Sequence, residues 1–283
     1  MKTLSRCLLG LLAAALLASA AYATTPVQIV TARGTGTSLP IAFTAANVTA
    51  GDTLVLEVYT QSAAPTSVTE SLAETVNTRV AWGGGGSSEF SVYDVLNSAG
   101  NAKVSFTINV SASQNITAIL EEYAGAAAHT FDQATAIATN TSTSVSSGSL
   151  TPAESGELAI GALVIAAGSD QVSAWGGGFV EEANQNSSGG VAPTINLADQ
   201  ILSSASPIAV TATLSGSYQW SVAELLYKPA ASSCTHAGIT SAGAISVPNG
   251  ASGSYRLANG SFGTPDCSTV SYFHSDGSLP GVN

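Results

Sequence analysis

Residues 102–110 read AKVSFTINV, and this stretch decides the fold class. Apolar residues alternate with Lys, Ser, Thr and Asn, so one face of the segment is apolar and the other is polar. Such alternation, with Val and Thr enriched, is typical of a half-buried antiparallel β-strand. The same period returns in residues 208–214, IAVTATL. The chain therefore contains at least two strands of one kind.

The strand pattern is repeated along the chain. The segment GDTLVL at 51–56 corresponds to GELAI at 156–160, and the two copies end together at Tyr123 and Tyr227. Loops differ in length between the copies, but the strand-like stretches keep their phase. Self-similarity at a near-constant offset indicates an internal duplication.

These patterns predict an all-β protein: an antiparallel two-sheet β-sandwich, jelly-roll-like, built from that duplication. Residues 24–229 would form the sandwich, with halves 24–125 and 126–229. The apolar run at 158–167 is expected to be a strand covered on both faces. Two Ig-like sandwiches in tandem remain an alternative. The expected core between the two sheets includes Val104, Phe106, Ile108, Ile208, Val210 and Leu214.

The N-terminus has the order of features found in secretory signal peptides. Lys2 and Arg6 precede an apolar run, and small residues in an A-x-A pattern end at Ala23. The apolar run is shorter than the ~20 residues that a bilayer span needs. Residues 1–23 are therefore interpreted as a signal peptide, and the remaining chain as secreted or periplasmic, with no membrane span.

Composition excludes one class of partner. The chain has 18 Asp and Glu against 7 Lys and Arg, a formal net charge of −11, and only 9% charged residues. A nucleic-acid binder needs a basic face, which so few basic residues cannot provide. No nucleic-acid partner is expected, and the composition leaves the oligomeric state open.

Residues 230–283 form a Ser- and Gly-rich tail. Cys234 and Cys267 are the only cysteines downstream of residue 23, and an exported compartment favours their oxidation to a disulfide. A zinc site would need His236 or His274 as well, but the close ligand pairs of a zinc module are missing from this sequence. The tail is therefore expected to be closed by a Cys234–Cys267 disulfide.

The segment LEEYAG at 120–125, the repeated Gly-Asp/Glu strand opening and the Ser/Gly-rich tail resemble secreted bacterial β-sandwich surface proteins of uncharacterised function, which are jelly-roll-like or lectin-like in layout. The resemblance covers residues 24–229. It implies a sandwich fold and supplies no catalytic residues.

Glu122 and Glu224 are the two candidate catalytic acids. Each lies on an apolar face of its strand, Glu122 with Leu120 and Glu224 with Leu226. A carboxyl in such surroundings has a raised pKa, which suits a general acid in glycan hydrolysis. The alternative is that both residues are structural. A Ser–His–Asp triad is not supported, since no G-x-S-x-G elbow occurs in the sequence.

Trp82 and Trp175 are the candidate ligand-binding residues, because each begins a Trp-Gly-Gly run, and the runs AWGGG at 81–85 and 174–178 are aligned as copies of the duplicated unit. A Trp at a strand end can stack on a sugar ring, whereas the structural alternative is a core Trp beside a tight glycine turn. No metal site is expected, since the acids are scattered and do not form D-x-D-x-D loops. No cofactor is expected either.

These observations favour a non-catalytic secreted surface or matrix module, adhesive or carbohydrate-binding, whose partner is an extracellular glycan or cell-surface polymer. Few charges and many Ser, Thr and Asn side chains suit glycan hydroxyls. A secreted glycan hydrolase or lyase that uses Glu122 or Glu224 is the alternative from another class. A structural spacer or filament subunit is the third hypothesis.

Overall fold

The computed structural model describes residues 26–84, 89–124, 130–187 and 193–229, followed by four two-residue strands. Within these residues every regular element is a β-strand, which confirms the all-β class. In this described part no helix is long and apolar enough to cross a bilayer. The predicted signal peptide and both tail cysteines lie outside the described residues. The two-residue strands pair as β14 (Gly238–Ile239) with β15 (Ile245–Ser246), and β16 (Tyr255–Arg256) with β17 (Phe262–Gly263).

The first half of the chain forms one antiparallel sheet, sheet A. Its strands pair in the order β1-β6-β2-β5-β4, and β3 also pairs with β6. Their bounds are β1 (Gln28–Ala42), β2 (Thr53–Thr60), β3 (Pro65–Glu70), β4 (Asn77–Gly83), β5 (Phe90–Val95) and β6 (Ser105–Tyr123).

The second half forms sheet B on the same plan. The order is β10-β13-β9-β12-β11, and β7 and β8 both pair with β13. The long strands β6 and β13 therefore have the same place in the two sheets, as do β2 and β9. Their bounds are β7 (Thr130–Ala134), β8 (Ala138–Ser146), β9 (Leu158–Ile165), β10 (Val172–Trp175), β11 (Val180–Asn186), β12 (Thr194–Ile201) and β13 (Thr211–Lys228).

Each sheet folds over and encloses its own core. In sheet A, residues 106–110 of β6 pair with β3, while residues 116–123 pair with β2. Phe106 and Ile108 from the first part of β6 consequently pack in one cluster with Leu54 of β2, all fully buried. Sheet B encloses a matching cluster that includes Val210 and Leu214.

The predicted core residues are therefore inside, but within single halves and not between the two sheets. Five of the six are buried, and Ile208 is only half-buried, because it precedes β13 and forms an isolated bridge with Leu150. The apolar run predicted to be covered on both faces is confirmed as β9, which is buried at every position.

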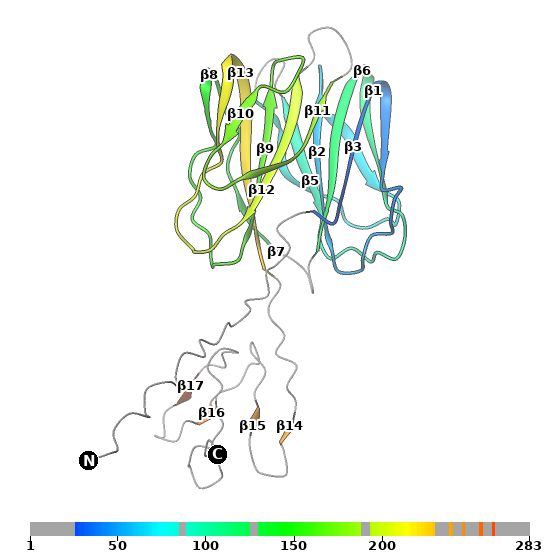
Figure 1. The fold of residues 1–283 in the computed structure, drawn as a ribbon. Coiled ribbons are helices and arrows are strands. Elements are labelled where there is room, and N and C mark those ends of the chain that lie inside the picture. The colour runs from blue at the N-terminus through cyan, green and yellow to red at the C-terminus, as the bar shows by residue number, and fades with distance from the viewer. Residues whose placement is uncertain are drawn as a thin grey trace, which may run out of the picture.

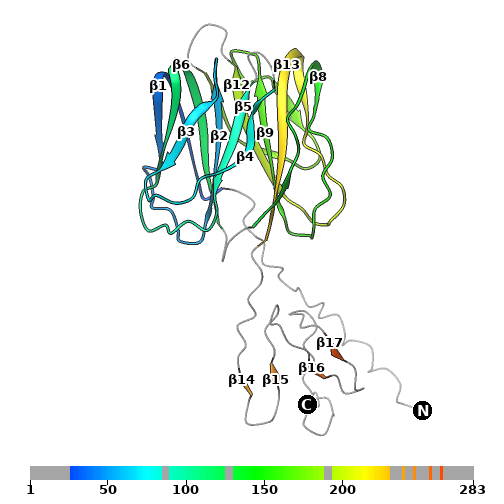
Figure 2. The same ribbon diagram turned by 180° about the vertical axis from the view of Figure 1, so that it is seen from behind.

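The two sheets pack against each other through a shared core. This cluster takes Val55 and Tyr59 from β2 and Ile119 from β6, and packs them on Ile160 of β9 and Leu225 of β13. Figure 1 shows the blue, cyan and blue-green strands of sheet A beside the green-to-yellow strands of sheet B, and Figure 2 shows the same arrangement from behind. Two antiparallel sheets packed together confirm the predicted sandwich.

Candidate functional site

Glu122 lies near the end of β6 and has no exposed surface. Ile119 and Glu121 point to one face of β6, toward the shared core. Glu122 points to the opposite face, into the core of the first half. One carboxylate oxygen accepts a hydrogen bond from the backbone N–H of Thr49 at 2.8 Å, and the other accepts one from the Gln28 amide. Both oxygens are therefore occupied by the chain itself, in a role that holds β1 and the loop before β2 against β6.

Glu224 lies in β13 and is also fully buried. It receives a long hydrogen bond of 3.3 Å from the Ser147 hydroxyl, whose oxygen accepts the backbone N–H of Val210 at 3.0 Å. Burial raises the pKa of Glu224 to about 7, and the bond from Ser147 opposes that shift. Glu224 faces the core of the second half, so the fold places the two candidate acids in different cores and does not bring them together.

The two Trp-Gly runs occupy different places in the two sheets. Trp82 is in β4, which pairs with β5, whereas Trp175 is in β10, which pairs with β13. The strand at the β4 position of sheet B is β11, so the alignment of these two runs as repeats was wrong. Apart from the tryptophan, the match consists of alanine and glycine, and both of these types occur throughout the chain. Trp82 is half-buried, and its indole N–H has no hydrogen-bond partner among the described residues.

Trp175 belongs to a small polar group that we call the Trp175 cluster: Trp175, Glu181 and Asn184. The indole N–H donates to Glu181 at 2.9 Å, and the Asn184 amide donates to the other oxygen of the same carboxylate at 2.8 Å. Gly177 and Gly178 make the turn after Trp175 possible, because their φ angles of 68° and 92° lie in the left-handed region that favours glycine. The ring packs against the second core and is half-buried, while Asn184 is exposed.

The opposite face of β11 contacts β1, because Gln185 pairs with Ile195 and faces the shared core, away from Asn184. The Thr31 hydroxyl donates to Gln185 at 2.7 Å, and the Arg33 guanidinium donates to the carbonyl of Asn186 at 3.2 Å. The Trp175 cluster thus brings an aromatic ring, a carboxylate and an amide together over β10 and β11. Such groups can bind the hydroxyls of a sugar and cover one of its faces.

A second set of polar side chains is buried between the sheets. Glu57 of β2, Glu121 of β6 and Asp199 of β12 all face the shared core and have at most 1% exposure. Burial raises the pKa of Glu57 well above its usual range and that of Glu121 to about 8, with Glu121 adding to the shift of Glu57. Burial, followed by the charge of Glu182, raises the pKa of Asp199 to about 7.

The ends of β6 and β13 make matching polar contacts across the shared core. The Tyr123 hydroxyl donates to Glu121, and its pKa is raised by burial and by the charges of Glu121 and Asp199. At the equivalent place in β13, burial and the charge of Asp94 raise the pKa of Tyr227. Each half thus supplies a tyrosine that faces an aspartate of the other half.

Asp94 is also held by its own sheet. It accepts 2.6 Å and 2.9 Å hydrogen bonds from Arg79 and Asn77, and its side chain has no exposed surface. The Arg79 guanidinium lies 4.2 Å above the ring centroid of Phe131 in β7, and the Phe131 ring packs edge-on against Tyr227. Arg79 therefore links the edge strand of sheet A to sheet B.

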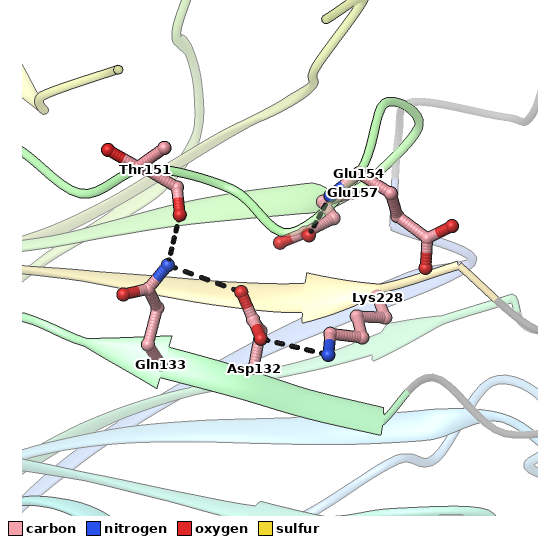
Figure 3. A network of polar contacts seen from close by, with 6 residues as sticks. All are labelled: Asp132, Gln133, Thr151, Glu154, Glu157 and Lys228. Carbon is pink, nitrogen blue, oxygen red and sulfur yellow. Dashed lines mark hydrogen bonds and ion pairs between the residues drawn. The ribbon is translucent and has the colours of Figure 1, made fainter. Parts of the chain in front are cut away.

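A third polar group lies at the end of β13 (Figure 3). Lys228 forms an ion pair with Asp132 at 3.1 Å. The Gln133 amide donates hydrogen bonds to Asp132 and to the carbonyl of Thr151. Glu157 accepts the backbone N–H of Glu154 at 2.9 Å close by. This network holds β7 against the loop before β9, so its role is structural. Its ion pair is partly exposed.

Sequence reasoning missed Glu181 and Asn184 beside Trp175, and also the buried acids Glu57, Glu121 and Asp199. An acid within an apolar strand was the pattern that marked Glu122, and the same pattern could have marked Glu57 in TLVLEVYT. In the described residues no three or more His, Cys, Asp or Glu side chains are grouped so as to hold a metal ion. Comparison with known proteins gave no match: no family model fits the chain, and no curated protein and no solved structure is significantly similar to it.

Proposed function

We propose that this chain is an exported, non-catalytic surface or matrix module that binds carbohydrate through the Trp175 cluster. The single observation that supports it most is the geometry of that cluster. The Glu181 carboxylate fixes the Trp175 indole at 2.9 Å and orients the exposed Asn184 amide at 2.8 Å, so ring and amide are presented together.

The candidate acids favour binding over hydrolysis. Glycoside hydrolysis requires two carboxyl groups that flank one bond, about 5 to 10 Å apart. Glu122 and Glu224 face separate cores, with no exposed surface through which a glycan could reach them. In this proposal the signal peptide ends at Ala23, and a Cys234–Cys267 disulfide closes the tail of the exported protein.

The proposal predicts glycan binding without turnover. A glycan array and a reducing-sugar assay on the same polysaccharides measure both. The variant Asn184→Ala should weaken the affinity about tenfold, since it removes one hydrogen-bonding group from the surface. Asn47→Ala is the matched control, because Asn47 is also exposed but lies in a loop of the first half.

Reducing-sugar release that Glu122→Gln or Glu224→Gln abolishes would contradict the proposal in favour of an enzyme. Equal loss of binding in Asn184→Ala and Asn47→Ala would show that the Trp175 cluster is not the site. Binding to no glycan would leave the spacer or filament role as the better hypothesis.

A further inference from the structure

Strand β8 is an edge strand with an unusual composition. It reads ATNTSTSVS, nine residues without a charge, a proline or a glycine. Among the described strands it pairs only with β13, so its other edge is open to a further strand. On β8 itself the Thr141 N–H donates to the Asn140 side chain, and the Ser144 carbonyl accepts from the Ser142 hydroxyl. Thr139, Thr141 and Thr143 are all exposed along it.

The other edge strands carry devices that discourage further pairing. In the ladders of β3, β4, β7, β10 and β11 the register shifts, and the extra residue is on the outer strand each time. Bulges, prolines and charges at edges are the usual means by which proteins prevent edge-to-edge association. In β4, β7 and β11 the extra residues include the charged side chains Arg79, Asp132 and Glu182.

Strand β1 is the strand most comparable with β8, and it is protected in another way. The register of each strand shifts against its long partner, β6 for β1 and β13 for β8. In both cases the extra residues belong to the long partner and not to the edge strand. However, β1 contains Arg33 and Pro40, and its Thr31 and Arg33 side chains contact β11. In the described chain β8 is thus the edge strand with neither its own bulge, nor a charge, nor a proline.

We propose that β8 is a self-association edge, where it pairs antiparallel with β8 of a second copy of this chain across a two-fold axis. Antiparallel pairing of identical strands satisfies both exposed edges at once and closes the assembly as a dimer. The chain has a net charge of −11, so most contacts between copies bring acidic surfaces together. The uncharged β8 avoids that repulsion, and threonine hydroxyls from the two copies would lie opposite each other. This inference does not depend on the proposed carbohydrate binding.

Sedimentation velocity of the full chain from low to high micromolar concentration tests the inference. The wild type should form a dimer, and Thr139→Lys/Thr141→Lys should weaken it at least about tenfold, because four like charges then meet across the new ladder. Added lysines lower the overall negative charge, so a general charge effect would strengthen association instead. Thr37→Lys/Thr69→Lys is the matched control: both threonines are exposed, on β1 and β3, and the charge change is the same.

Hydrogen exchange locates the contact in the same samples. Amide exchange in β8 should slow as the wild-type concentration rises, and should stay constant in the Thr139→Lys/Thr141→Lys variant. A wild type that stays monomeric overturns the proposal, and so does a dimer that survives the β8 substitutions. A dimer equally weakened by the control variant also overturns it.

Discussion

Replacing Arg79 by alanine is expected to lower the free energy of unfolding by about 3 to 5 kcal/mol at neutral pH. Asp94 has no exposed surface and is paired with Arg79 at 2.6 Å, so the variant leaves a buried carboxylate without its cation. It also removes the guanidinium that lies 4.2 Å from the ring centroid of Phe131. Urea unfolding followed by circular dichroism measures the loss.

The double variant Arg79→Ala/Asp94→Asn separates the ion pair from packing. If the loss comes from an uncompensated charge, removing that charge should recover more than half of it. A loss under about 1 kcal/mol for Arg79→Ala would place this pair among ordinary surface ion pairs and contradict its buried role. An unrecovered loss in the double variant would assign the effect to the contact with Phe131.

The free energy of unfolding of the wild-type protein is expected to fall as the pH rises from 5 to 8. Burial raises the pKa of Glu121 to about 8 and that of Asp199 and Glu224 to about 7. The folded protein therefore holds these protons at pH values where the unfolded chain has released them. Their stabilisation is complete below the unfolded pKa values and is lost as the pH rises through the folded ones.

Glu121 alone is expected to contribute about 4 kcal/mol to this fall, since each pH unit between its two pKa values costs about 1.4 kcal/mol. The midpoint of thermal unfolding should drop by about 10 °C over the same range. Calorimetry at constant ionic strength gives both the midpoint and its pH dependence.

Glu57→Leu is the matched variant for this effect. Both Glu57 oxygens are buried and have no hydrogen-bond partner in the described residues, so an apolar side chain of similar size should stabilise the fold. The gain should be larger at pH 8 than at pH 5, because the buried acid resists ionisation. A stability that is flat or rises from pH 5 to 8 would contradict buried, protonated carboxyls between the sheets.

The sequence predicted the fold class because strand periodicity is local. Alternation in residues 102–110 and the apolar run at 158–167 each report the burial of one strand without reference to its neighbours. The core into which a strand face packs depends on distant parts of the chain, so the sequence of one strand does not reveal it. Phe106 alternates as predicted, but β6 spans both layers of sheet A, so its first part packs inside the first half instead of between the sheets.

The candidate site was harder to predict for the same reason. The apolar faces that carry Glu122 and Glu224 are visible in sequence, but their separation into two cores depends on the register of β6 and β13. Trp175 was found as a motif, whereas Glu181 and Asn184 come close to it only through the turn from β10 to β11. Tyr123 and Asp199 face each other only because one sheet packs on the other.

The two halves share a core, and we expect them to unfold as one unit. Hydrogen exchange followed by mass spectrometry, in increasing urea, tests this expectation directly because it reports on β6 and β13 separately. One transition is expected, in which both strands lose protection with the same midpoint and the same free energy, as in a cooperative unit. Two transitions, with β6 and β13 exposed at different urea concentrations, would contradict it and would favour two independent sandwiches in tandem.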